Sequence, residues 1–120
     1  MPDSPQDVHK KILGRKGEKA VATYLKKLGV KILETNFRTP FGEADLIVQD
    51  GDEIAFVEVK TRTGDGYGTP SEAVTADKRR RYRKIAQFYW LKNHEEPNAR
   101  FDVAEVYADG RIEYLKHAFY

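Results

Sequence analysis

Three carboxylates and a lysine stand close together in two neighbouring β-rich runs of the chain: Glu43, Asp45, Glu58 and Lys60. Carboxylate oxygens are the ligands that hard divalent cations such as Mg²⁺ prefer in proteins. A cation bound in this way activates water for the hydrolysis of phosphate esters. A lysine on the same face would lie within reach of the activated group. These residue types therefore indicate metal-dependent hydrolysis.

A tight turn between the two runs would bring these side chains together. The runs cover residues 43–49 and 53–62, and we expect a two-residue type II′ turn at Gly51-Asp52 between them. In the register that this turn sets, Asp45 lies opposite Glu58, and side chains on one face of each strand alternate with those on the other. A three-residue turn would shift the register by one and separate the two carboxylates.

Two opposed carboxylates are unusual in a sheet, because like charges in this position destabilise the strand pair and burial adds to the cost. A bound divalent cation removes both penalties. The alternative is an exposed hairpin face, on which glutamate and lysine are ordinary residues. Apolar residues occupy both faces of the hairpin, Ile47 and Phe56 on one and Val57 and Val59 on the other. This pattern favours a sheet that is covered on both sides.

The elements that would position the hairpin follow from hydrophobic spacing. Apolar residues at three- and four-residue spacing predict an amphipathic helix over residues 9–28, with Gly29 as its stop. The further elements expected are strands at 30–37, 100–107 and 111–115, a glycine-rich loop at 63–70 and a helix within 71–93. We therefore expect an α/β domain with a central mixed five-stranded sheet flanked by helices, in the order α-β-β-β-α-β-β.

Length and composition exclude several classes of protein. A chain of 120 residues has room for one domain, here expected over residues 9–120, after a disordered tail at residues 1–8. The absence of cysteine excludes disulfides and cysteine-bound zinc. The three histidines lie far apart in the sequence and form no zinc motif, so we expect oxygen ligands, as is typical of Mg²⁺ or Mn²⁺. No apolar run approaches the roughly 20 residues of a membrane span and none resembles a signal peptide, so we expect a cytoplasmic protein without a membrane partner.

The net charge of +2 conceals a cluster of cations. It comprises Lys78, Arg79, Arg80, Arg81, Arg83 and Lys84. Like charges at neighbouring helical positions repel one another, so the cluster favours an anionic partner. A nucleic-acid backbone is the partner that we expect, with binding that weakens as salt rises. The alternative is a solvated helix face. Arg62 and Tyr67 are further candidates for contacts with nucleic acid.

An ordered set of segments resembles a known family. The segments are residues 14–18, 36–38, 42–47, 56–62, 100–102 and Lys78, and together they span nearly the whole chain. Asp45 followed by Glu58-Val59-Lys60 resembles the Asp…Glu-x-Lys core of the restriction-endonuclease-like nucleases. The whole set is similar to the small bacterial family UPF0102 (YraN-like), which is related to archaeal Holliday junction resolvases. The resemblance implies a restriction-endonuclease-like domain.

The resemblance also implies an activity, that of a Mg²⁺-dependent endonuclease acting on DNA, including branched or damaged DNA. Asp45, Glu58 and Glu18 would be the metal ligands, and Lys60 would position or help to deprotonate the attacking water. Judged without the resemblance, Glu18 is an ordinary glutamate of an exposed helix. Relatives of resolvases are expected to act as homodimers, because a four-way junction presents two strands to cut.

The main alternative is a non-catalytic nucleic-acid-binding module that keeps the same fold. Two further acids have no assigned role in the expected site. Glu43 is a candidate for supporting the site or for pairing with Lys60, and Asp102 is a candidate for supporting the edge of the site or for pairing with a basic residue.

Overall fold

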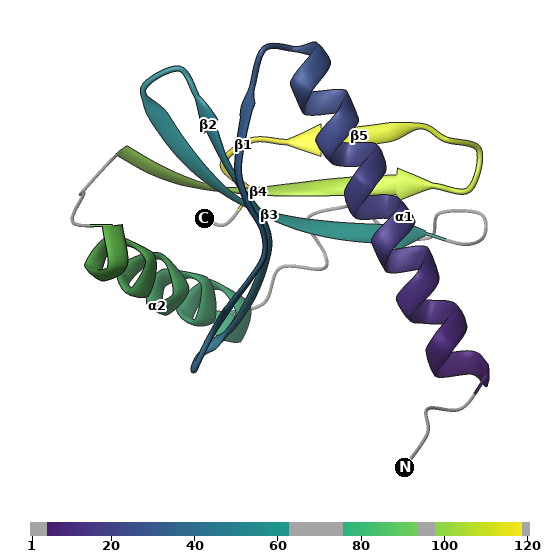
Figure 1. Cartoon of the computed structure of the whole chain (residues 1–120), viewed down its shortest axis with the longest axis horizontal. Coiled ribbons are helices and arrows are strands. Elements are labelled where there is room, and N and C mark those ends of the chain that lie inside the picture. Colours follow the sequence, from purple (N-terminus) through teal and green to yellow (C-terminus); the bar gives the residue numbers. More distant parts are fainter. Residues whose placement is uncertain (1–4, 63–75, 94–97, 119–120) are drawn as a thin grey trace.

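The computed structural model describes residues 5–62, 76–93 and 98–118, and these residues form one sheet with two helices (Figure 1). The elements in chain order are α1 (Pro5–Lys27), β1 (Lys31–Thr39), β2 (Gly42–Asp50), β3 (Glu53–Arg62), α2 (Ala76–Asn93), β4 (Asn98–Tyr107) and β5 (Ile112–Leu115). The predicted α/β class and the order α-β-β-β-α-β-β are confirmed.

The sheet is mixed, as expected, with the spatial order β1-β2-β3-β4-β5. β3 and β4 are parallel, and every other neighbouring pair is antiparallel. A parallel pair requires a crossover connection, and α2 lies within that connection. This arrangement places the central strand β3 between the hairpin partner β2 and the crossover partner β4.

The turn between β2 and β3 is the predicted two-residue turn. Asp50 pairs with Glu53, and the ladder continues to the Leu46–Val57 pair in the expected register. Gly51 has a φ of 64°, the left-handed value that the first position of a type II′ turn requires and that glycine adopts without strain.

Both faces of the sheet are covered, as the apolar residues of the hairpin predict. On one face, Ile47 and Phe56 pack against Tyr82 and Ile85 of α2. On the opposite face, α1 packs against the side chains of Leu46, Val48, Ala55 and Val57 through Val21 and Leu25 (Figure 1). A charge at the end of this hairpin therefore lies beside a two-sided core.

The helix α1 begins at Pro5 rather than near residue 9, so residues 5–8 belong to the helix and not to the expected tail. Proline fits the first turn because its ring fixes a helical φ and its missing N–H has no partner there. At the other end the expected stop is confirmed, since Gly29 has a φ of 85° and Val30 N–H donates to the Leu25 carbonyl at 3.0 Å.

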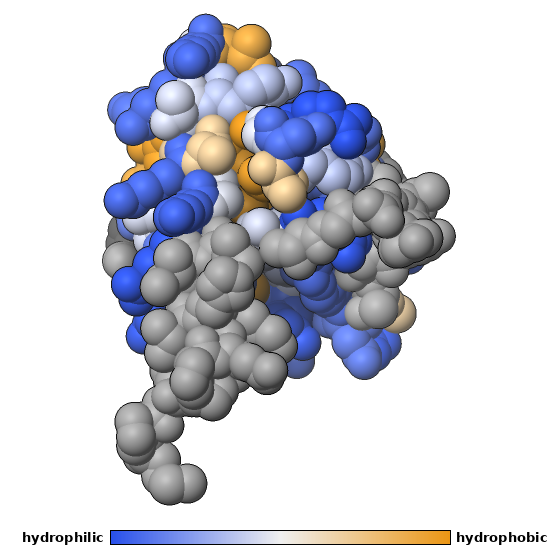
Figure 2. Space-filling view, turned by 90° about the vertical axis from the view of Figure 1, so that its right-hand side faces the viewer, coloured by the Kyte–Doolittle hydropathy of each residue, from blue (hydrophilic) through white to orange (hydrophobic). Residues whose placement is uncertain are grey.

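No helix in the described part of the chain is both long and apolar enough to cross a bilayer. Hydrophilic side chains predominate on the face seen in Figure 2, and hydrophobic ones form small patches between them.

Candidate functional site

Asp45 lies on β2, one residue beyond the Leu46–Val57 pair that ends the ladder with β3. Its carboxylate takes the place of a backbone acceptor there, because Val59 N–H donates to Asp45 Oδ2 at 2.8 Å. Asp45 is thus fixed beside Glu58 through the neighbouring amide of Val59, and not as the directly opposed ladder pair that the sequence predicts. The two carboxylates are nonetheless brought together.

The environment of Asp45 disfavours its negative charge. Burial raises the pKa of Asp45 from 3.8 to about 7, although the hydrogen bond from Val59 opposes the rise. Repulsion from Glu18, Glu58 and Glu43 raises the pKa further. The structure therefore places all the expected carboxylates within electrostatic reach of Asp45, and an aspartate of this kind favours either a proton or a nearby cation.

Glu58 lies at the centre of the site and is 8% exposed. Its Oε1 accepts a short hydrogen bond from Lys78 Nζ and lies 3.3 Å from Lys60 Nζ. Its Oε2 is buried and meets no hydrogen-bond donor among the described residues. A buried carboxylate oxygen without a partner carries a desolvation penalty, so one side of Glu58 is left for a further positive group.

The pKa values of the two lysines that share Glu58 Oε1 are shifted in opposite directions. Burial lowers the pKa of Lys78, and repulsion from Lys60 adds to the shift despite the hydrogen bond to Glu58. Burial also pulls the pKa of Lys60 down, but interactions with Lys78 and Glu58 outweigh it and raise the pKa overall. Lys60 is therefore the more firmly cationic of the pair.

Glu18 reaches the site from α1. A Cβ on Gly17 would lie only 2.5 Å from Thr61 Oγ1, so the helix approaches the end of β3 more closely than a larger residue would permit. Burial raises the pKa of Glu18, a side-chain hydrogen bond with Asn36 opposes the rise, and Glu43 adds repulsion. Asn36 has a φ of 51°, a left-handed value that asparagine tolerates better than most residues.

The predicted set of three metal ligands is not gathered, since no group of three or more acidic or histidine side chains in the described residues is close enough to hold an ion. Asp45 and Glu58 do fit a divalent cation: they are adjacent, partly desolvated, and one Glu58 oxygen lacks a partner. Two carboxylates, completed by water and substrate phosphate, are a usual donor set for Mg²⁺. Glu18 lies near enough to Asp45 to raise its pKa by charge repulsion.

Lys78 is a site residue that the sequence reasoning assigned to the nucleic-acid surface instead. It lies one helical turn before Tyr82, which is buried against the sheet together with Ile85 and Tyr89. Residues four apart share one face of a helix, so this spacing is the signal that directs Lys78 to Glu58. The backbone N–H of Asp45 also donates to the phenol oxygen of Tyr82, which ties α2 to the site.

The other cations of the expected cluster point in different directions. Arg80 forms an ion pair with Asp77, and Arg79 is half-buried. Besides Arg80, three further side chains of the cluster are exposed: Arg81, Arg83 and Lys84. A helix with 3.6 residues per turn cannot place consecutive residues on one face, so the cluster of cations expected from the sequence does not form one continuous surface.

Arg62 is not a free phosphate-binding group. Its Nε lies 2.7 Å from Glu105 Oε2 and its second guanidinium contact to Oε1 is 3.1 Å, so a buried glutamate of β4 holds it bidentately. The glycine-rich loop at 63–70, including Tyr67, lies outside the described residues.

The two acids without an assigned role both form ion pairs. Glu43 lies 3.8 Å from Arg38, and Asp102 is 3.0 Å from the buried Arg100. Arg100 also binds Asp50 at 2.8 Å and Glu53 at 3.2 Å. This cluster lies at the turn end of the β2–β3 hairpin, and it joins β4 to that turn.

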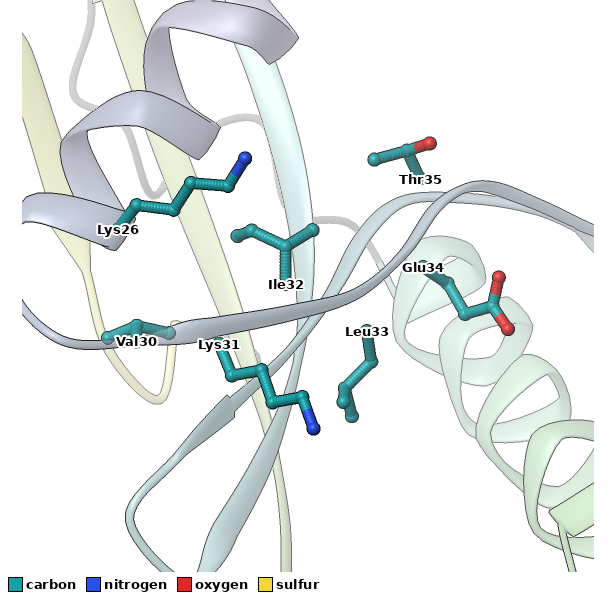
Figure 3. A pocket seen from close by; sticks show the side chains of 7 residues that line it. All are labelled: Lys26, Val30, Lys31, Ile32, Leu33, Glu34 and Thr35. Atoms are coloured by element: carbon teal, nitrogen blue, oxygen red, sulfur yellow. The ribbon is translucent and has the colours of Figure 1, made fainter.

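A pocket of about 540 Å³ lies elsewhere, at the start of β1, and is lined by Lys26 and residues 30–35. Figure 3 shows Ile32 on one side of the β1 backbone and Lys31 and Leu33 on the other. The side chains do not converge on a common point, and Glu34 is the single carboxylate among those that line it. The pocket therefore lacks the paired groups that the hairpin site contains.

The chain is similar to known proteins along most of its length. The sequence profile described as "Uncharacterised protein family UPF0102" matches residues 17–106. A UPF0102 protein from Syntrophus aciditrophicus (strain SB) is 50% identical over 110 residues, which cover 88% of this chain and 87% of that protein. A second, from Thermodesulfovibrio yellowstonii, is 44% identical over 108 residues, covering 90% and 96%. The matched span contains Glu18, Asp45, Glu58, Lys60 and Lys78.

Proposed function

The chain belongs to the UPF0102 family, and from that premise and the geometry around Asp45 and Glu58 we propose that it is a metal-dependent endonuclease that hydrolyses phosphodiester bonds in DNA. The observation that carries the proposal is Glu58 Oε2, which is buried without a hydrogen-bond donor in the described part of the chain. It lies beside a second carboxylate whose pKa is raised to about 7. A divalent cation suits both groups.

Asp45 and Glu58 would hold Mg²⁺ or Mn²⁺. When bound, the cation would lower the pKa of a water molecule and offset the charge that develops on the phosphoryl oxygens. Lys60, which is firmly cationic and partly exposed, would bind the scissile phosphate and orient the attacking water. Glu18, whose pKa is raised by burial, would accept a hydrogen bond from that water. Lys78 keeps Glu58 Oε1 compensated and in place.

In this hydrolysis the water oxygen forms a new bond to phosphorus, the bridging P–O bond breaks, and the leaving oxygen takes up a proton. The protein would hold the scissile phosphate in the orientation that this attack requires. The exposed cations Arg81, Arg83 and Lys84 on α2 would contact the phosphate backbone on either side of the cut. Branched or damaged DNA in the cytoplasm is the substrate that we propose, and a homodimer would suit a four-way junction.

A second candidate function is that of a non-catalytic module that binds nucleic acid. It is favoured by the ion pairs of Glu58, because Lys78 and Lys60 already neutralise one oxygen of this carboxylate without a metal. In that case the cluster would stabilise the junction of α2 and β3, and the exposed cations of α2 would bind the backbone.

The test compares cleavage of linear and branched DNA, with Mg²⁺ or Mn²⁺, by the wild type and by the Asp45→Ala and Lys60→Ala variants. Asp52→Ala is the matched control, since it removes an exposed acid in the same hairpin. We expect both site variants to lose at least about a hundredfold in rate and the control to keep full activity. Salt-sensitive DNA binding without cleavage under either metal would reject the nuclease and support the binding module.

A further inference from the structure

The tip of the β1–β2 hairpin is held rigidly. Thr39 pairs with Gly42 across the turn, and Pro40 and Phe41 occupy the two positions between them. Phe41 N–H donates to Thr39 Oγ1 at 3.0 Å, and this hydroxyl donates in turn to the Gly42 carbonyl at 2.8 Å. Proline fixes its own φ, so the turn has little conformational entropy to lose on binding.

The tip is also fixed against α2. Gly42 has a φ of 138°, and a Cβ at this position would lie 2.7 Å from Arg81 Cδ. The side chain of Arg81 therefore passes directly over the backbone of the turn. In Figure 1 the tip of the β1–β2 hairpin, at the lower left, lies near the N-terminal half of α2. The aromatic ring of the tip and the cations of α2 consequently form one surface.

Phe41 is unusual because it is 44% exposed on a structured turn. Lys84 Nζ lies 5.5 Å from the centre of its ring and covers part of it. Arg81 adjoins the turn, and Arg38, whose side chain is 85% exposed, lies on β1 beside it. Glu43, 3.8 Å from Arg38, is the acid that accompanies these cations. An aromatic face flanked by cations matches a nucleobase flanked by phosphates.

We propose that Phe41 is a stacking platform for an unpaired base of DNA. This inference rests on the proposed nuclease function and names its substrate class: DNA in which unpaired bases adjoin a duplex. The bases of an intact duplex are stacked on one another, so a fully paired substrate offers this surface its phosphates alone. Asp45 is four residue steps from Phe41 along extended chain, a span of about 13 Å. The cut would fall about four base steps from the stacked base.

The test measures binding by fluorescence anisotropy in EDTA, with a labelled DNA duplex and with the same duplex carrying a bulge of unpaired thymines. We expect the wild type to prefer the bulged DNA. Phe41→Ala should weaken binding to it about tenfold to a hundredfold and leave duplex binding within about twofold. Phe41→Trp should keep the preference. Leu28→Ala, which removes another exposed hydrophobic residue, is the matched control and should change neither affinity.

Salt dependence separates stacking from phosphate contact. Phe41→Ala should leave the slope of log affinity against log salt unchanged, whereas Arg81→Ala should reduce it by about one. The inference would be overturned if Phe41→Ala lost affinity equally for both DNAs or lost none for bulged DNA. A wild type that does not prefer bulged DNA would overturn it as well. So would competition by polyglutamate as strong as by oligonucleotide, or a wild-type dimer that Phe41→Ala dissociates, since these identify a protein partner or a second copy of the chain.

The inference and the proposed function fail separately. A protein that prefers bulged DNA through Phe41 but cleaves nothing with Mg²⁺ or Mn²⁺ would refute the nuclease and keep the stacking platform. If the wild type cleaves DNA and Asp45→Ala does not, but Phe41→Ala still prefers bulged DNA, the nuclease proposal stands and the stacking platform is refuted.

Discussion

Replacing Asp45 by asparagine should stabilise the metal-free protein at alkaline pH, although it removes a charged group from the site. The pKa of Asp45 is raised from 3.8 to about 7, mainly by burial, so the folded protein holds a proton there that the unfolded chain releases. The free energy of unfolding therefore falls as the pH rises from about 4 to about 7, and stays low above that range. Asparagine mimics the neutral form at every pH.

The magnitude follows from the shift. About three pKa units at about 1.4 kcal/mol each give an upper limit of about 4 kcal/mol for the gain in Asp45→Asn at pH 8, and a gain near zero at pH 4. The side-chain oxygen of asparagine can still accept the hydrogen bond from Val59 N–H, which Asp45 Oδ2 accepts at 2.8 Å. The substitution thus removes the charge and keeps the contact.

Urea unfolding in EDTA at pH 4 and pH 8 measures this effect, with the fluorescence of the single tryptophan, Trp90, as the signal. Asp50→Asn is the matched control, and we expect it to lower the free energy of unfolding at pH 8, where Asp45→Asn should raise it. A hydrogen bond from Arg100 lowers the pKa of Asp50, so its charge stabilises the fold above the ordinary aspartate pKa and this stability is lost as the pH falls. If Asp45→Asn is destabilised at pH 8, or shifts stability equally at both pH values, the electrostatic reasoning is wrong.

Two further predictions concern the metal and the second charge cluster. Mg²⁺ at 100 times its Kd should raise the unfolding free energy of the wild type by about 2.7 kcal/mol at pH 8, but not that of Asp45→Asn; equal shifts in thermal melting would place the ion elsewhere. Arg100→Ala should cost about 3–5 kcal/mol in urea unfolding at pH 7, because it leaves the fully buried Asp102 without its positively charged partner. Arg111→Ala, which removes an exposed pair with Asp109, should cost under about 1 kcal/mol, and similar losses in both would contradict the argument.

Local patterns were sufficient to predict the β2–β3 hairpin. Alternating apolar residues identify the two strands, and a glycine at the first position of the turn sets the register that pairs Ile47 with Phe56. The approach of Asp45 to Glu58 follows from that register. The detail that the sequence could not supply is the hydrogen bond from Val59 to Asp45, since it depends on where the backbone ladder ends.

The positions of Glu18 and Lys78 depend on packing between elements. Glu18 reaches the site because α1 approaches β3 where Gly17 lies against Thr61, and no periodicity along the chain encodes that approach. Lys78 did carry a usable signal, its four-residue spacing from Tyr82. The run of like charges around Lys78 instead favours a place on a nucleic-acid-binding surface. The spacing of a helical lysine from buried aromatic residues therefore predicts which way its side chain faces better than the charge of its neighbours does.

The two charge clusters of this sheet differ in how completely they are satisfied. In the Arg100 cluster every guanidinium nitrogen has a carboxylate partner, and both oxygens of Asp102 accept hydrogen bonds, from Arg100, Tyr114 and the backbone of His117. The guanidinium of Arg100 and the buried carboxylate of Asp102 are therefore both satisfied within the described residues.

At the other end of the hairpin, Glu58 uses one oxygen for two lysines and leaves the other buried without a donor among the described residues. The adjoining Asp45 carries a pKa that favours a positive neighbour. Both clusters place charges beside the same core, so burial alone does not distinguish them. The unsatisfied oxygen does, because among the described residues Arg100 and Asp102 are fully hydrogen-bonded at one end of the hairpin, whereas Glu58 Oε2 lacks a donor at the other. This difference is what supports a cation site at Glu58 rather than at Asp102.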